Sequence, residues 1–152
     1  MKRMFCRMAA VAAVLLVAGV SQQGFAQEKA KSRTLKVKLN YTGSGPVDDK
    51  HRIIVFLFDS PDFTQGGVMP FAEKDGAAKD AVVTFSDLDR SPVYVSCVYD
   101  PTGGYDGQSG PPPSGSSLGM YTTEPPAPGA VKIDEGKTAE IALPFDDSFK
   151  MP

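Results

Sequence analysis

The chain has 152 residues, of which 18 are acidic and 16 are basic, and its formal net charge is −2 at pH 7. A mildly acidic chain without basic runs argues against nucleic acid and anionic membrane surfaces as partners. One histidine and two cysteines exclude zinc and cupredoxin sites, which need several His or Cys ligands. The length suits one domain with its own core.

The first residues have the pattern of a secretory signal peptide. Three basic residues precede an apolar run over Met8–Val20, and Gly24 and Ala26 provide small residues at a cleavage site. We therefore predict a signal peptide over residues 1–26 and a single exported domain, periplasmic or secreted, over residues 27–152. Cleavage removes three basic and no acidic residues, so the net charge becomes −5. An uncleaved anchor is the alternative.

The segments that follow predict strands. Arg33–Tyr41 alternates between apolar and polar residues, which is typical of a strand with one face in water. Ile53–Phe58 is apolar on both faces and is expected to be a central, covered strand. Val68–Phe71 is expected to be a short edge strand. Glu73–Asp80 is expected to form one helical turn.

The central stretch is Val82–Asp100, which we interpret as a hairpin: strand, tight corner, strand. Val93, Val95, Cys97 and Tyr99 share one face, and this face is expected to point into the core. Cys97 is the only cysteine after the predicted cleavage site, so we expect no internal disulfide and a buried, unreactive thiol. Leu88 is expected to plug one end of the core.

Residues 101–129 differ from the rest, because nearly half of them are glycine or proline. A loop of this length without structure of its own is commonly functional or disordered. Tyrosines offer contact area and a hydroxyl at low entropic cost, so Tyr105, Asp106 and Tyr121 are the candidate ligand-binding residues. Beyond this loop, strands are predicted over Ala130–Ile133 and Thr138–Phe145.

The pattern from Phe85 onward resembles the prealbumin-like (transthyretin-like) sandwiches of the carboxypeptidase regulatory-domain type, and a related group of small exported bacterial proteins. In those families a phenylalanine, a leucine three residues on and a glycine-tyrosine corner lead into an alternating strand. Phe85 and Leu88 match, whereas Ser91 and Val93 stand where the glycine and tyrosine would be. The resemblance covers roughly residues 35–145. It implies a β-sandwich and a non-enzymatic role, and it supplies no site residues.

Two sequence features suggest chemical activity. Gly115–Gly119 matches a nucleophile elbow centred on Ser117, but it lacks the flanking strand and helix that the motif needs, and His51 is the only histidine. Four aspartates near loops could supply oxygen ligands to calcium, although their spacing matches no calcium loop and turn formation is the favoured interpretation. These are Asp100, Asp106, Asp146 and Asp147.

Together these patterns predict an all-β fold: an antiparallel β-sandwich of about seven strands, prealbumin-like or immunoglobulin-like. The function expected is a non-catalytic domain that binds a partner protein or a glycan through its loops, without a cofactor, a metal or catalytic residues. A calcium-stabilised accessory domain is the alternative, and a hydrolase is the third possibility.

Overall fold

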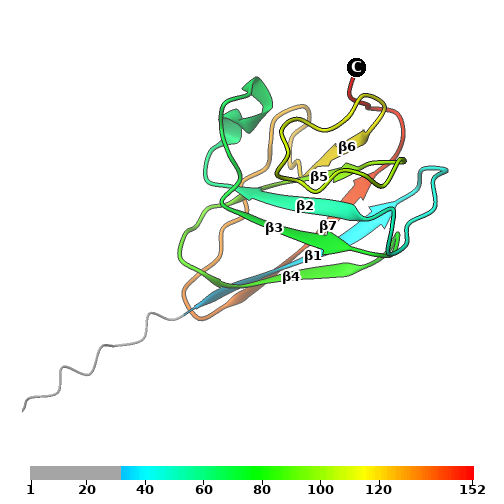
Figure 1. The fold of residues 1–152 in the computed structure, drawn as a ribbon. Helices are drawn as coiled ribbons and strands as arrows, with labels where there is room; N and C mark the ends of the chain where they lie inside the picture. Colours follow the sequence, from blue (N-terminus) through cyan, green and yellow to red (C-terminus); the bar gives the residue numbers. More distant parts are fainter. Residues whose placement is uncertain (1–31) are drawn as a thin grey trace, which may run out of the picture.

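The computed structural model describes residues 32–152 and shows a two-layered β domain (Figure 1). The predicted signal peptide, residues 1–26, lies outside the described residues. One sheet has the order β4-β1-β7 and contains β1 (Arg33–Tyr41), β4 (Val82–Leu88) and β7 (Thr138–Phe145). The other has the order β3-β2-β5-β6 and contains β2 (Ile53–Phe58), β3 (Ala72–Gly76), β5 (Tyr94–Tyr99) and β6 (Ser117–Met120). A short 3₁₀ helix, η1 (Pro61–Gln65), follows β2. Across residues 32–152, no helix is long and apolar enough to cross a bilayer.

The predicted β-sandwich is confirmed, with one parallel strand pair. β1 and β7 run side by side in the same direction, and Leu35 lies opposite Ala139. Parallel neighbours need a long connection between them. Here the chain forms β2 to β6 before it returns to the edge of its first strand. The other neighbouring strands are antiparallel.

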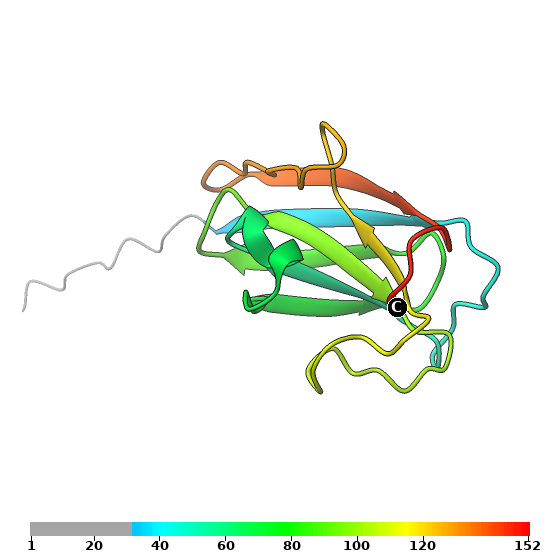
Figure 2. The same cartoon turned by 90° about the horizontal axis from the view of Figure 1, so that it is seen from above.

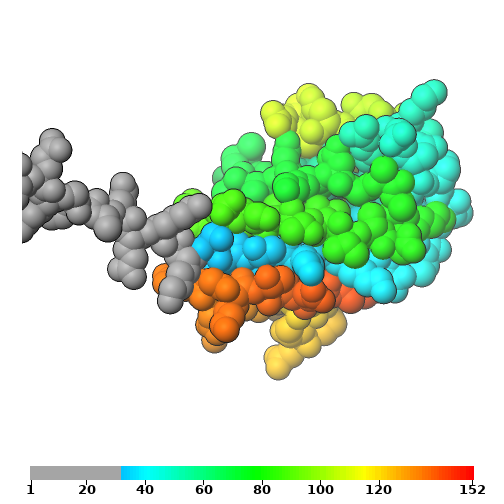
Figure 3. Space-filling view, turned by 90° about the horizontal axis from the view of Figure 1, so that it is seen from below, coloured from blue at the N-terminus to red at the C-terminus, as the bar shows by residue number. Residues whose placement is uncertain are grey.

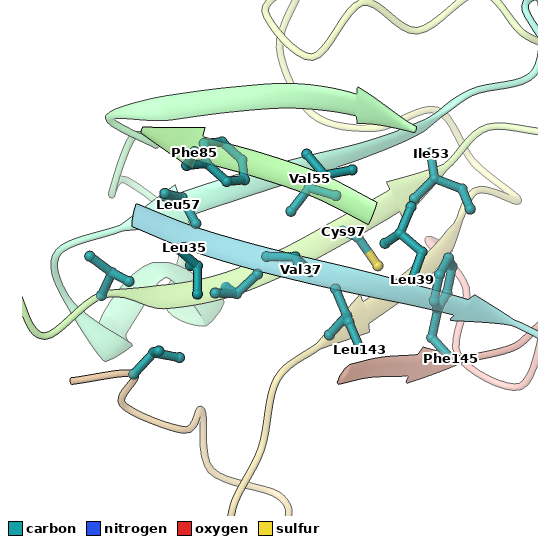
Figure 4. Close-up of a cluster of buried hydrophobic side chains, with 14 of the residues drawn as sticks. Leu35, Val37, Leu39, Ile53, Val55, Leu57, Phe85, Cys97, Leu143 and Phe145 are labelled. Atoms are coloured by element: carbon teal, nitrogen blue, oxygen red, sulfur yellow. The ribbon is translucent and has the colours of Figure 1, made fainter. Parts of the chain in front are cut away.

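The core lies between the two sheets and is built from alternate residues of each strand. In Figure 4 the labelled side chains of β1 and β2 gather between the ribbons, with Phe85 and Cys97 beside them. Leu35, Val37 and Leu39 of β1 are fully buried, as the alternation predicts. Each such side chain contributes about 1.5–3 kcal/mol when it leaves water. β2 is central and buried on both faces, so that prediction is also confirmed.

The predicted central hairpin over Val82–Asp100 is wrong in its pairing. β4 pairs with β1 in one sheet, whereas β5 pairs with β2 and β6 in the other. The corner between them therefore crosses from one sheet to the other. Alternation shows that both strands have an inward face, but it does not show whether they pair side by side or face each other across a core. Leu88 is buried at this end of the core, as expected for a plug.

Two segments near β2 and one near β7 also differ from prediction. The edge strand is not Val68–Phe71 but the polar segment Ala72–Gly76, which replaces the helical turn expected over Glu73–Asp80. Edge pairing uses backbone groups, so apolar side chains were a poor guide to it. Ala130–Ile133 forms no strand; Val131 makes a single bridge to Val93.

Residues 101–129 are not a loop throughout, because they contain β6. This strand forms the edge of the four-stranded sheet, and Gly119 lies against the core. A Cβ at Gly119 would lie 2.7 Å from Phe145 Cβ and 2.8 Å from Cys97 Sγ. The absence of a side chain there lets the edge strand approach the core closely. Gly119, one of the many glycines and prolines for which this segment was predicted to be a loop, therefore has a packing role.

The outer surface of the three-stranded sheet is mainly polar, with Val82 as its exposed large apolar residue. Figure 3 shows β1 (blue) between orange residues of β7 and green residues of β4. Lys36 and Glu140 form an ion pair on this face, with 2.9 Å between Nζ and Oε1. This face is the wet side that the alternation of Arg33–Tyr41 predicts.

Candidate functional site

The outer face of the four-stranded sheet is apolar and carries a groove. Ile54, Phe56 and Phe58 of β2 alternate with the core residues and point outward. With Val98 of β5 they form a second apolar cluster, separate from the core between the sheets. Phe56 and Phe58 lie at a ring-centroid distance of 6.5 Å and form the floor of the groove.

Three segments form the walls of this groove. These are residues 63–70 with part of η1, residues 105–112, and residues 144–151 near the C-terminus. All three lie on the same side of the sheet, at the top of Figure 1. Seen from above in Figure 2, η1 lies toward one end of the sheet and the C-terminal residues toward the other. We call the hollow between them the outer groove, and its volume is about 1080 Å³.

The rim of the outer groove exposes large apolar side chains. Met69 is 76% exposed and Phe149 is 65% exposed, and both line the groove. Phe63 stacks on Phe58 with 4.4 Å between ring centroids, so η1 is attached to the groove floor. Exposed apolar patches of this kind mark surfaces that contact something else. Val82 on β4 is also exposed, but it lies outside the groove.

The C-terminal wall is held by backbone hydrogen bonds to β6 and the residues before it. Met151 N–H donates to Ser116 O at 2.9 Å, and Gly115 N–H donates to Met151 O at 2.9 Å. Leu118 N–H donates to Phe149 O, also at 2.9 Å. The tail therefore covers part of the edge of β6 and holds Phe149 at the rim of the groove.

Of the three predicted binding residues, two lie together. Tyr105 lines the outer groove, and its hydroxyl donates to Gly110 O at 3.1 Å. Burial raises the pKa of Tyr105, and the nearby carboxylates of Asp106 and Glu73 add to this. Asp106 accepts hydrogen bonds from the backbone N–H groups of Gln108 and Ser109.

The Asp106 carboxylate has a structural role in this loop. Its bonds to Ser109 and Gln108 lower the pKa of Asp106 to about 2. Tyr121 lies elsewhere: its N–H donates to Val95 O at 2.9 Å, and its ring packs against the main core. The structure therefore brings Tyr105 and Asp106 together and places Tyr121 away from them.

A smaller polar pocket of about 300 Å³ lies beside Tyr105 and Asp106. Two of its charged side chains are paired with each other: Arg52 Nη1 lies 2.9 Å from Asp75 Oδ2. Asp100, also in this pocket, is 4% exposed. Burial alone would raise the pKa of Asp100, but hydrogen bonds from the residues after it outweigh burial and lower that pKa. These donors are the Thr102 N–H and hydroxyl and the N–H groups of Gly104 and Tyr105.

Ser117 does not have the geometry of a nucleophile elbow. It lies within strand β6, is buried, and donates to Asp147 Oδ1 at 2.8 Å. His51 lies against Asp48, with 3.0 Å between Nδ1 and Oδ1. Serine and histidine thus have different carboxylate partners.

Asp147 is the centre of a hydrogen-bond network that joins three segments. Its oxygens accept from Tyr41 Oη (2.5 Å), Ser117 Oγ (2.8 Å), Ser44 N (2.9 Å) and Ser44 Oγ (3.0 Å). The Tyr41 bond, followed by those from Ser44 and Ser117, holds the pKa of Asp147 well below its usual range. Burial and the same carboxylate raise the pKa of Tyr41.

Each of the four aspartates considered as calcium ligands has hydrogen-bond partners of its own. Asp100, Asp106 and Asp146 each accept from N–H groups of the residues after them, as turn-forming aspartates do. Asp147 belongs to the Tyr41 network. Within residues 32–152, no three His, Cys, Asp or Glu side chains are grouped so that they could hold a metal ion.

Sequence reasoning missed the outer groove. Its signal was present in two places: the outward face of the doubly apolar strand Ile53–Phe58, and apolar residues in segments otherwise typical of loops. Phe63, Met69 and Phe149 are the clearest of these. Comparison of this protein with family models, with curated proteins and with solved structures finds no match. The prealbumin-like resemblance therefore stays a prediction.

Proposed function

We propose that this chain is an exported, non-catalytic binding domain whose outer groove takes an extended apolar segment of a partner protein. The observation that carries the proposal is the groove over the outer face of β2, β5 and β6: its floor residues Phe56 and Phe58 are buried beneath the walls, and its rim leaves Met69 and Phe149 exposed to water. Apolar surface that stays in water costs free energy, and a partner that covers it gains that free energy on binding.

The chemistry of the lining favours a protein segment over a glycan. Phe, Val, Met, Pro and Leu side chains supply most of the groove lining, and side chains that can form hydrogen bonds are the minority. A sugar buried here would leave hydroxyl groups without partners, which is costly. An apolar peptide side chain loses no hydrogen bond when it enters such a groove.

The walls are suited to binding at low entropic cost. Pro70 lies in one wall, and Pro111 and Pro112 lie in another. Proline restricts the backbone before binding, so less freedom is lost when a partner docks. The wall that contains Tyr105, residues 105–112, is part of the 101–129 segment, which the sequence predicts to be the binding loop.

The groove is tested with a synthetic peptide that has an extended core of leucine, valine and phenylalanine. We expect Met69→Asp with Phe149→Asp to weaken its binding at least about tenfold, because the peptide would desolvate two unpaired carboxylates. Both positions are exposed, so the fold is retained. Isothermal titration or fluorescence anisotropy measures the affinity.

The matched control is Val82→Asp, which adds a carboxylate at an exposed apolar residue of the other sheet. The affinity of Val82→Asp for the peptide is expected to stay within about twofold of the affinity of the parent protein. If the groove variant binds the peptide as the parent does, the outer groove is not the binding site.

A further inference from the structure

We propose that the segment bound in the outer groove carries lysine or arginine residues beside its apolar core. This inference rests on the proposed function and adds the charge of the partner to it. The reason is the distribution of charge around the groove: three exposed carboxylates and the half-buried Glu73 stand on the walls or beside them, and within the described walls Lys150 is the one lysine.

The first carboxylate is that of Glu73, on the β3 side of the groove. It lies opposite Phe56 in the strand register, so it shares the outward face with that ring. Gln108 Nε2 donates to Glu73 Oε1 at 2.5 Å. A Cβ at Gly107 would lie 2.9 Å from Glu73 Oε2 and 3.2 Å from Phe56 Cε1. The carboxylate therefore stands beside the groove floor, next to the 105–112 wall.

Three more carboxylates complete the rim. Asp62 belongs to η1, directly before Phe63, and is exposed. Asp106 is exposed directly before the wall residue Gly107, and Asp146 lines the groove itself. The rim therefore has an acidic residue near each of its segments.

The nearby cations do not cancel this charge. Arg52 is paired with Asp75, and Arg90 is paired with Asp59 and Asp89. Lys74 of β3 turns toward the other sheet, where its Nζ donates to Thr84 O at 2.6 Å. The remaining basic residue of the described groove walls is Lys150, which lies between Phe149 and Met151.

An apolar groove with an acidic rim selects among apolar segments by their flanking charges. Opposite charges at a rim raise the association rate and favour the matching partner, while like charges disfavour the wrong one. Because the rim is exposed, salt weakens this selection, and charges farther apart than the Debye length, about 10 Å at 0.1 M, are largely screened from each other. The apolar contribution to binding is insensitive to that screening.

The test uses two peptides with the same apolar core, one with two lysines at each end and one with two glutamates. We expect the native protein to bind the lysine-flanked peptide about tenfold more tightly at low salt, and this preference to shrink as sodium chloride is added. The triple variant Glu73→Gln, Asp62→Asn, Asp146→Asn removes three charges and retains side chains that accept hydrogen bonds. It is expected to bring the two affinities within about twofold.

The control triple, Asp80→Asn, Glu124→Gln, Asp134→Asn, removes the same charge from exposed positions outside the groove. It is expected to keep the preference. One result would overturn the charge inference and leave the groove function standing. In that case the native protein binds both peptides with equal affinity, and Met69→Asp/Phe149→Asp binds neither. Binding of neither peptide overturns both. Two other findings would overturn both the charge inference and the groove function, because each identifies a different occupant. One is that the groove binds a fluorescent fatty acid and not the peptides. The other is that the native protein sediments as a dimer and Met69→Asp/Phe149→Asp does not.

Discussion

Asp147 shows how one side chain can hold together distant parts of this fold. It joins Tyr41 at the end of β1, Ser44 in the following turn, and Ser117 on β6. Tyr41 and Asp147 are 106 positions apart in the sequence. No local pattern relates them, so the sequence suggested a loop aspartate and not a structural link.

The first prediction concerns Asp147→Ala. We expect it to lower the free energy of unfolding by about 2 kcal/mol at pH 7, because it removes charge-assisted hydrogen bonds and leaves the Ser117 hydroxyl, which is buried, without its partner. Chemical denaturation of both proteins measures this. Asp80→Ala, at an exposed carboxylate outside the network, is expected to change stability by less than about 0.5 kcal/mol.

The same variant has a pH dependence of known sign. The pKa of Asp147 is lowered in the folded state, so its stabilising effect is complete above about pH 4, the ordinary aspartate pKa. It is lost as the pH falls through the lowered folded pKa. The stability gap between the parent and Asp147→Ala should therefore narrow below pH 4, and a gap that stays constant down to pH 2 contradicts the assignment.

At the scale of single elements, β2 divides its residues between two environments. Val55 and Leu57 belong to the core between the sheets, whereas Phe56 belongs to the outer cluster and lines the groove. The sequence predicted a strand buried on both faces, and that is confirmed. It could not show that the outer cover consists of η1 and loops, because apolar composition does not identify the covering element.

The second prediction compares Phe56→Ala with Leu57→Ala. Both are expected to destabilise the protein by about 3 kcal/mol, within the usual range for emptying a buried site. Only Phe56→Ala should also weaken binding of an apolar peptide, because it removes groove floor. Denaturation and peptide titration separate the two effects. A Phe56→Ala loss below about 1 kcal/mol would place this ring outside the stabilising structure.

Three strands have the bounds that the sequence predicts, and one of them, Ile53–Phe58, is buried on both faces. Arg33–Tyr41 and Thr138–Phe145 have their predicted bounds, since burial on one face imposes alternation. β3 was missed because it is polar, and β6 was missed because it is a four-residue strand within a segment rich in glycine and proline. The corner after β4 was assigned to a hairpin because alternation is the same for paired and for facing strands.

At the scale of the molecule, the two sheets have different outer faces. The three-stranded sheet presents a polar face, while the four-stranded sheet presents the outer groove. Which sheet face is apolar and is walled by loops depends on how the sheets and loops are arranged, and this is a tertiary property. Tyr105, predicted as a ligand-binding residue, lines this groove, whereas Phe56 and Phe58 were assigned to packing alone.

The last prediction concerns the 101–129 segment and uses Cys97 as its reporter. Cys97 is 1% exposed, and burial raises its pKa, so in the native protein it should resist thiol reagents unless denaturant is added. Replacing only residues 107–112 by glycine and serine removes one groove wall and retains β6. This variant should keep Cys97 protected and lose affinity for the apolar peptide.

Replacing residues 102–128 by a short linker is expected to have a different result, because it also deletes β6. Gly119 of β6 lies against Cys97, and its N–H contacts the thiol. Without β6 the edge of β5 is open to solvent, so Cys97 should react in the absence of denaturant, and unfolding should occur at lower denaturant concentration. Mass spectrometry after timed labelling measures the reaction. If this variant protects Cys97 as well as the 107–112 variant does, β6 adds no cover to the core, and the whole segment is an appendage to a sheet that is complete without it.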